Sequence, residues 1–160
     1  MNHAISEPGA KTIVILGFEG CLPSGLVGLV DMFWLANQAN QANIAPSPAG
    51  DSSVESGQTA PRAAAFKVIT ASLNGKALRD GMGRRIAVDA HVQDVTTADA
   101  VLIPGLIHGT QGLPQARAIA PVTQWLRGQH LRGSLLAGSC AGVFVLGEAG
   151  LLNQRRCTTT

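Results

Sequence analysis

The chain has 160 residues, of which 46% are hydrophobic and only 14% are charged, and its mean hydropathy is +0.20. These values exclude a disordered chain and provide enough apolar side chains for one domain with a substantial core. The formal net charge of +2 is too small to indicate nucleic-acid binding on electrostatic grounds alone.

Targeting and metal-binding signals are absent from the sequence. No apolar run approaches the roughly 18–20 residues that span a bilayer, and the start MNHAISEPGAKT lacks the basic and apolar regions of a signal peptide. The cysteines Cys21, Cys140 and Cys157 form neither a disulfide framework nor a CxxC pair. We therefore expect a cytoplasmic protein with reduced thiols and with no membrane partner, no metal and no cofactor.

The first 37 residues predict a strand followed by a helix. Residues 12–18 (TIVILGF) form a continuous apolar run, which is typical of a strand buried on both faces. After a loop at 19–23, Ser24 is placed to cap a helix that runs to about Asn37. Five apolar residues of this helix recur at helical spacing and are expected to face the core: Leu26, Val27, Val30, Phe33 and Trp34.

The next region changes character and then returns to strand patterns. Residues from about 38 to 64 contain few large apolar side chains, so we expect a flexible insertion there that contributes nothing to the core. Residues 66–72 (FKVITAS) predict a second strand. The Asn74-Gly75 turn signal and a short strand at 85–88 indicate a small hairpin appended to the main sheet.

Strand and helix patterns alternate again in the second half. Residues 99–105 (DAVLIPG) predict a buried strand that is followed by the loop 106–109. Residues 114–119 are weakly helical, and a separate helix is expected from Pro121, in its first turn, to about Gln129. The alternation along the whole chain predicts an α/β fold with an open, mostly parallel sheet.

The most informative stretch is SLLAGS at 134–139, which predicts a buried strand and passes directly through Cys140 into the apolar helix 141–152. The junction Gly138–Gly142 has the Gly-x-nucleophile-x-Gly pattern of a sharp strand-to-helix turn, and we call it the elbow. Amides that open the following helix, from Ala141 onward, point toward such a residue and favour a thiolate. The pattern predicts a reactive or ligand-facing cysteine, although a small buried hydrophobe would have the same sequence.

Ligands of open α/β sheets bind beyond the carboxyl ends of the strands. Three loops are expected there, at 19–24, 106–110 and the elbow. In the second loop, the amides of Gly105 and Leu106 are candidates for binding an oxyanion, with an ordinary strand-terminating turn as the alternative. His108 is a candidate proton acceptor or a solvated loop residue, and Cys21 is a second pocket residue or a core residue.

At this point the chain resembles a known group of proteins. IVILGFEG, VLIPG and AGSCAGVFVLGEAGLLNQRRCTTT resemble the ThiJ/PfpI superfamily, the flavodoxin-like relatives of class I glutamine amidotransferases. The segments DMFWLAN and AGVFVLGEAGLL…RR.TT are most similar to the N-terminal domain of GlxA-like AraC-family regulators. The resemblance covers nearly all of residues 1–160 apart from 38–64. It implies a flavodoxin-like sandwich, a homodimer, and DNA binding through C-terminal helix-turn-helix motifs not present in this chain.

Two departures from the family pattern bear on chemistry. The resemblance implies that enzymes of the superfamily hold a carboxylate against the elbow cysteine, and the corresponding residue here is Gly25; Glu19 is the nearest acid and lies several residues early. The family's catalytic-type histidine, a last strand and closing helices would follow Thr160. We therefore expect an incomplete domain whose C-terminal part is missing.

These features favour a ligand-sensing and dimerisation domain of an AraC-family regulator, whose partners are a small-molecule effector, a second copy and DNA. Its ligand-binding residues are expected to be Cys140, Ala141, Gly105, Leu106, Cys21 and Gly25. The alternative is a cysteine-dependent hydrolase, hydratase or deglycase in which Cys140 is the nucleophile and recruits His108 or Glu19. A third possibility is a fold that serves dimerisation alone.

Overall fold

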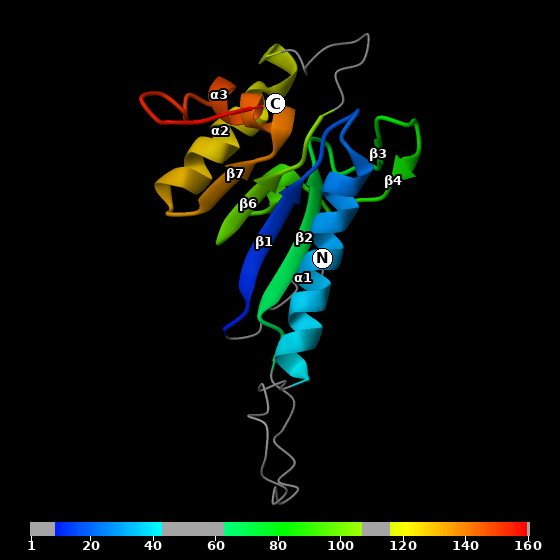
Figure 1. Ribbon diagram of the computed structural model, residues 1–160. Coiled ribbons are helices and arrows are strands. Elements are labelled where there is room, and N and C mark those ends of the chain that lie inside the picture. The colour runs from blue at the N-terminus through cyan, green and yellow to red at the C-terminus, as the bar shows by residue number, and fades with distance from the viewer. Residues whose placement is uncertain (1–8, 43–62, 107–115, 160) are drawn as a thin grey trace, which may run out of the picture.

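The computed structural model describes residues 9–42, 63–106 and 116–159 (Figure 1). Most of the expected insertion at 38–64 and the candidate His108 lie outside these residues. The expected insertion begins too early, because the helix that precedes it continues to Gln41. Asn37 fixes this end of the helix to the sheet, since its side chain donates to the Phe66 carbonyl at 2.7 Å and accepts from the Phe66 amide at 2.9 Å.

The centre of the molecule is a five-stranded, all-parallel sheet in the spatial order β5-β2-β1-β6-β7. Its strands are β1 (Lys11–Leu16), β2 (Phe66–Ser72), β5 (Ala90–His91), β6 (Ala100–Ile103) and β7 (Leu135–Gly138). The buried runs of β1 and β6 occupy the middle, as their continuous apolar patterns predict. The predicted α/β fold with a mostly parallel, flavodoxin-like sheet is confirmed.

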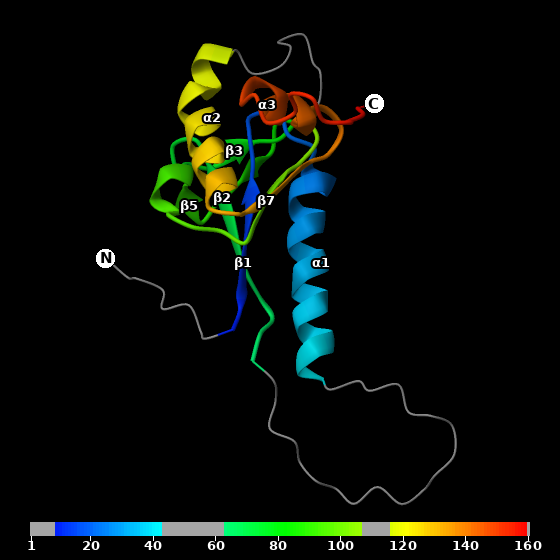
Figure 2. The same ribbon diagram turned by 90° about the vertical axis from the view of Figure 1, so that its left-hand side faces the viewer.

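Helices cover both faces of this sheet (Figure 2). Helix α1 (Pro23–Gln41) lies on one face, and α2 (Ala116–Leu131) lies on the other. The prediction of two separate helical segments on either side of Pro121 is wrong, because α2 is one helix that contains this proline. Pro121 has no N–H and cannot donate the backbone hydrogen bond of its position. A 3₁₀ turn, η2 (Cys140–Gly142), leads into α3 (Val143–Glu148), which is shorter than the predicted helix 141–152 and packs against β7 and α2.

A small hairpin is present, but its turn lies at 80–84 rather than at Asn74-Gly75, and the hairpin is not joined to the main sheet. Strands β3 (Leu78–Arg79) and β4 (Arg85–Ile86) form a separate antiparallel pair. A single 3₁₀ turn, η1 (Val92–Asp94), then leads toward β6. Figure 1 shows the hairpin beside the first turns of α1, at the end of the sheet to which the strands point. Its place makes it a wall of the surface described below.

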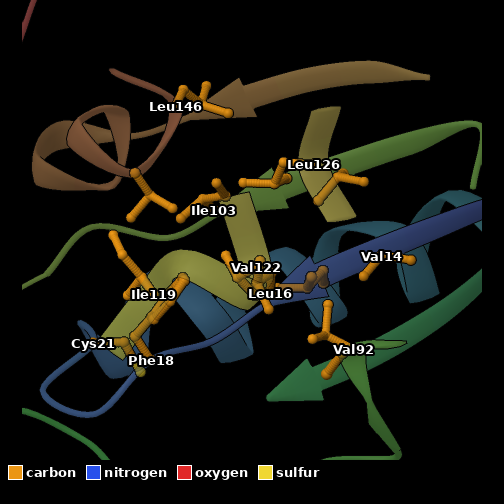
Figure 3. Packing of buried hydrophobic residues seen from close by; sticks show 14 of the residues in the cluster. Val14, Leu16, Phe18, Cys21, Val92, Ile103, Ile119, Val122, Leu126 and Leu146 are labelled. Carbon is orange, nitrogen blue, oxygen red and sulfur yellow. The ribbon is translucent and has the colours of Figure 1, made fainter. Parts of the chain in front are cut away.

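The hydrophobic core brings together buried side chains of the sheet, of α2 and, through Leu26, of α1; Figure 3 shows part of it. Its fully buried members include Val14, Leu16, Phe18, Ile103, Ile119, Val122 and Leu126. Burial of each such side chain contributes about 1.5–3 kcal/mol relative to leaving it in water. Phe18 and Cys21 lie beyond the end of β1 and point into this same core, so the carboxyl end of the sheet rests on packed side chains.

Strand β7 differs from the buried strand predicted at 134–139. Exposed and half-buried residues alternate along it, and Leu135 is 61% exposed. The reason is its place in the sheet: among the described residues β7 pairs only with β6. An edge strand with one covered face buries only every second side chain.

The apolar stripe predicted for α1 is also partly wrong. Leu26 is buried, Val30 packs against the core and the Phe33 ring contacts that of Phe66, but Val27 and Trp34 are 43% and 57% exposed. The helix is apolar on more than one side, so its sequence allows two neighbouring stripes to face the sheet. The stripe at 26, 30 and 33 is the one that does.

Candidate functional site

Three connections meet beyond the carboxyl ends of β1, β6 and β7. The segment after β6 lies in the middle, because the Gly105 carbonyl accepts the Leu22 amide at 2.8 Å on one side. On the other side, the Ile103 carbonyl accepts the Ser139 amide at 2.9 Å. Cys21 and Leu106 form an isolated antiparallel bridge that extends the first of these contacts. Backbone hydrogen bonds therefore hold the predicted site loops against one another.

The elbow has the sharp geometry that its glycines predict. Cys140 adopts a φ of +49°, in the left-handed region, which costs a non-glycine residue about 1 kcal/mol or more. A Cβ built on Gly142 would lie 2.6 Å from the carbonyl oxygens of Ile103 and Pro104, and one built on Gly138 would lie 2.8 Å from the Val143 nitrogen. Only residues without a Cβ allow the chain to pass this close to its own backbone.

Three of the predicted ligand-binding positions lie together at this point. A Cβ built on Gly105 would lie 3.3 Å from the Cβ of Cys140 and 2.9 Å from the Leu22 side chain. A Cβ built on Gly25 would lie 3.2 Å from the Cβ of Pro104 and 3.6 Å from the Gly105 nitrogen. Gly105 thus lies between Gly25 on one side and the half-buried Cys140 on the other.

Other predicted site residues have different surroundings. Cys21 and Leu106 are 0% and 5% exposed, so both side chains belong to the core, and Ala141 is fully buried behind Cys140. Burial raises the pKa of the Cys21 thiol above its ordinary value, although its hydrogen bond to Phe18 acts in the opposite direction. A buried thiol that holds its proton is a poor nucleophile.

Glu19 is engaged by the hairpin. Its Oε2 accepts a hydrogen bond from the Arg79 amide at 2.9 Å, and the neighbouring Gly20 amide donates to the Arg79 carbonyl at 2.8 Å. The Gly81 amide in turn donates to the Cys21 carbonyl at 2.9 Å. The loop that carries Glu19 therefore fastens the hairpin to the site, and one carboxylate oxygen is occupied in doing so.

One contact at the elbow was not predicted as part of the site. The hydroxyl of Thr159 donates to the Cys140 carbonyl at 3.1 Å, so the end of the described chain returns to the elbow (Figure 1). The only sequence signal for this contact is the threonine run at 158–160, which is part of the stretch that resembles the family.

A groove of about 710 Å³ lies between α1 and the hairpin. Its lining includes Val27 and Asp31 from the helix and Met82 and Arg85 from the hairpin. The hairpin turn is built on the buried carboxylate of Asp80, which accepts bonds of 2.8–3.0 Å from the Met82 amide and from the amide and side chain of Arg84. Burial would raise the pKa of this carboxyl, but these bonds outweigh it and the pKa lies below its ordinary value. The hairpin wall is thus a preformed structure.

The described residues contain neither a metal-binding cluster nor a membrane-spanning helix. No group of three His, Cys, Asp or Glu side chains in ranges 9–42, 63–106 and 116–159 is placed to hold a metal ion. Within the same ranges no helix combines the length and the apolar character that crossing a membrane requires.

Fold and site define an α/β protein of flavodoxin-like topology with a cysteine at the apex of a nucleophile elbow. Residues 52–160 match the model of the DJ-1/PfpI family, and the chain belongs to that family. This confirms the superfamily that the sequence resembles.

Three relatives illustrate the similarity. The chain is 24% identical over 151 residues to an uncharacterised protein in the cpoL 5′ region of Streptomyces lividans, covering 94% of this chain and 88% of that protein. A putative transcriptional regulator from Vibrio parahaemolyticus aligns with a TM-score of 0.67 at 19% identity, over 91% of this chain and 64% of that one. An AraC family transcriptional regulator from Pseudomonas putida aligns with a TM-score of 0.59 at 19% identity, over 92% and 65%. The chain thus spans less than two thirds of these two solved structures, and at this identity they show the fold.

Proposed function

We propose that this chain is a ligand-sensing and dimerisation domain of an AraC-type transcriptional regulator and that it binds a small metabolite beside Cys140. The observation that carries the proposal is the residue at position 25. The family resemblance implies a catalytic carboxylate there, whereas glycine packs at that position against Pro104 and Gly105. A site that keeps the elbow but has no carboxylate at this position is suited to binding rather than to covalent turnover.

The connection between site and hairpin supports a sensing role. Leu22 and Cys21 belong to one loop, which donates to Gly105 beside the elbow and accepts from Gly81 in the hairpin. A ligand that displaces Gly105 or Leu22 therefore acts on a loop that also holds the hairpin. The two solved regulators of similar fold provide the precedent for the class of protein. DNA contact would come from a helix-turn-helix region outside these 160 residues, and the regulator would act in the cytoplasm.

A second candidate function is a cysteine-dependent hydrolase, hydratase or deglycase. The positive φ of Cys140 favours it, because strained apex residues at a strand-to-helix turn are typical of enzyme nucleophiles. In this case Cys140 would attack an electrophilic carbon, and Glu19 or His108, the two candidates that the sequence offers, would accept its proton.

Thermal-shift and calorimetric measurements of binding, with a panel of small amines, amides and amino acids, distinguish the two functions. We expect reversible binding by the wild type and by Cys140→Ser, without consumption of the compound. Gly105→Ala should weaken binding about tenfold, because its Cβ would occupy space between Leu22 and Cys140. Gly147→Ala is the control, since its Cβ would meet only the Leu152 side chain, at 3.9 Å.

Two outcomes would overturn the sensing function. Turnover of a compound by the wild type that is lost in Cys140→Ser would establish the enzyme. Binding of no compound, together with a dimer that forms normally, would leave dimerisation as the domain's role.

A further inference from the structure

A second cavity lies at the β7 edge of the sheet, apart from the groove beside the hairpin. It has a volume of about 290 Å³ and lies between β7, the end of α2, and α3 with the turn that follows it. These elements pack on one another, and the Nε of Arg127 in α2 donates to the Ala149 carbonyl after α3 at 2.8 Å. The fold itself therefore holds the walls of the cavity together.

Most of the cavity lining is apolar. Leu146 is only 4% exposed, whereas Leu135 is 61% exposed. The hydroxyl of Ser134, which also lines the cavity, donates to the Ala98 carbonyl at 2.6 Å and is thus already engaged. These side chains offer a ligand apolar contact rather than hydrogen bonds. Five leucines contribute to the lining: Leu135, Leu136, Leu146, Leu151 and Leu152.

Basic side chains lie at the same cavity. Arg155 and His130, both exposed, complete its lining. Neither ion pair of the described residues includes Arg155. Glu148 is the only acidic residue in the range 127–156, so positive charge predominates around the cavity and favours an anionic ligand. The same range contains four arginines: Arg127, Arg132, Arg155 and Arg156.

A tight turn brings Arg155 to the leucines. Gln154 adopts a φ of +59°, in the left-handed region that residues with a Cβ rarely occupy. The Arg155 amide donates to the Leu152 carbonyl at 3.0 Å and closes the turn. As a result, the charged Arg155 and the apolar Leu151 and Leu152 line one cavity from a single short segment.

We propose that this cavity binds a short-chain aliphatic carboxylate, with its tail among the leucines and its carboxylate on Arg155. The guanidinium of arginine matches a carboxylate with two parallel hydrogen bonds, and His130 provides a further N–H donor. The site goes beyond the proposed function, because it uses Leu135 and Leu136 at the start of β7, whereas the elbow follows the end of that strand. A ligand here does not require one beside Cys140.

Calorimetry with the full 160-residue chain and a series of carboxylates from propanoate to octanoate tests the proposal. Affinity should rise about three- to fourfold with each added methylene until the tail fills the cavity, and should then level off. Hexanol should bind at least about fivefold more weakly than hexanoate, since it has no charge to meet Arg155. Hexylamine should show no binding, because its charge has the wrong sign. Amide chemical shifts in an NMR titration with hexanoate should change at 134–136 and 151–155.

Substitutions of exposed residues separate the charge from the apolar contact. Arg155→Gln should weaken hexanoate binding about fivefold and leave hexanol binding unchanged. Arg156→Gln is its matched control, since Arg156 is an exposed arginine outside the lining, and it should have no effect. Leu135→Asp should bind hexanoate about fivefold more weakly than Leu135→Asn, because only the aspartate repels the carboxylate. Leu131→Asp, at an 87% exposed position outside the lining, controls for the added charge.

Three results would overturn the proposal. Equal affinities for hexanoate and hexanol would show that Arg155 takes no part. Affinity that continues to rise with chain length, or shift changes away from 134–136 and 151–155, would indicate unspecific binding of an apolar tail. Self-association that sedimentation velocity detects and that Leu135→Asp abolishes would place a second copy of the chain over the cavity instead.

Discussion

Two strand-to-helix connections follow the carboxyl ends of strands of the sheet, and each contains a cysteine. Residues 17–22 join β1 to α1 and carry Cys21, whereas residues 139–142 join β7 to α3 and carry Cys140. In the first connection the amide and carbonyl of Cys21 are hydrogen-bonded to Phe18 and Gly81, and its thiol is fully buried. In the second, Cys140 is half-buried at a left-handed φ of +49°.

The comparison shows that the burial of a cysteine after a strand depends on the conformation and contacts of the surrounding backbone, and not on its position after the strand alone. The first connection directs its thiol into the core, where the pKa is raised by burial. The second leaves Cys140 half-buried against the core, where the glycines at its base let the turn press against the backbone at the end of β6.

The largest effect is expected from Gly142→Ala. The added Cβ would lie 2.6 Å from two backbone carbonyl oxygens, which cannot move without disrupting β6, so we expect a loss of roughly 3 kcal/mol or more in the free energy of unfolding. Urea unfolding measures it. Gly147→Ala is the control in the adjoining helix and should instead gain about 0.5–1 kcal/mol from helix propensity. Equal effects of the two substitutions would mean that the elbow is not closely packed.

The next prediction concerns access to the two thiols. In a Cys157→Ser background, iodoacetamide should modify Cys140 at least roughly a hundredfold faster than Cys21, because Cys21 reacts only when the structure opens. Peptide mass spectrometry after timed quenching gives both rates in one sample. The same measurement in denaturant is the control and should bring the two rates together. Similar rates in the native protein would contradict the burial of Cys21.

Replacing each cysteine by glycine is expected to change the free energy of unfolding by a smaller amount, with opposite signs for the two residues. Cys140→Gly should stabilise the fold by about 0.5–1 kcal/mol, since glycine adopts the left-handed conformation without strain. Cys21→Gly should destabilise it by about 1–3 kcal/mol, since a buried side chain is lost. Urea unfolding of both variants gives the sign directly. Destabilisation by Cys140→Gly would show that the thiol contributes packing that outweighs the strain.

The sequence predicts the elbow well because its signal is local. Residues 134–152 combine an apolar strand, the two glycines Gly138 and Gly142 and an apolar helix pattern. The structure has a sharp turn at the junction between them. Three of the strands of the sheet follow from the same kind of local pattern, in 12–18, 66–72 and 99–105. These runs are long enough to specify their own secondary structure.

The burial of Cys21 and the choice of the face of α1 that packs on the sheet depend on contacts between distant parts of the chain. Cys21 is buried because it forms a bridge with Leu106, 85 positions later, and no local pattern contains that pairing. The stripe of α1 that faces the sheet is chosen by packing, since Leu26 and Val27 are equally apolar neighbours. Strand β5 is only two residues long and has no period to detect.

The smallest expected effect is the pH dependence that Cys21 confers. Its pKa in the folded state is raised above the ordinary 9.0, so the folded protein holds this proton more tightly than the unfolded chain does. The resulting stability is fully present below the unfolded-state pKa and is lost as the pH rises from there through the folded pKa. The free energy of unfolding should therefore fall above pH 9 with a slope contribution of at most about 1.4 kcal/mol per pH unit.

Urea unfolding between neutral pH and the alkaline limit of folding measures this slope in the wild type, Cys21→Ser and Cys21→Ala. The two substitutions differ in packing and should differ in absolute stability, but neither has a group that titrates there, so they should share the same shallower slope. A slope equal to that of the wild type would mean that Cys21 is solvated in the folded state. Since burial both raises this pKa and withholds the thiol from reagents, that result would have to be accompanied by rapid alkylation of Cys21, and the two cysteines would then be alike after all.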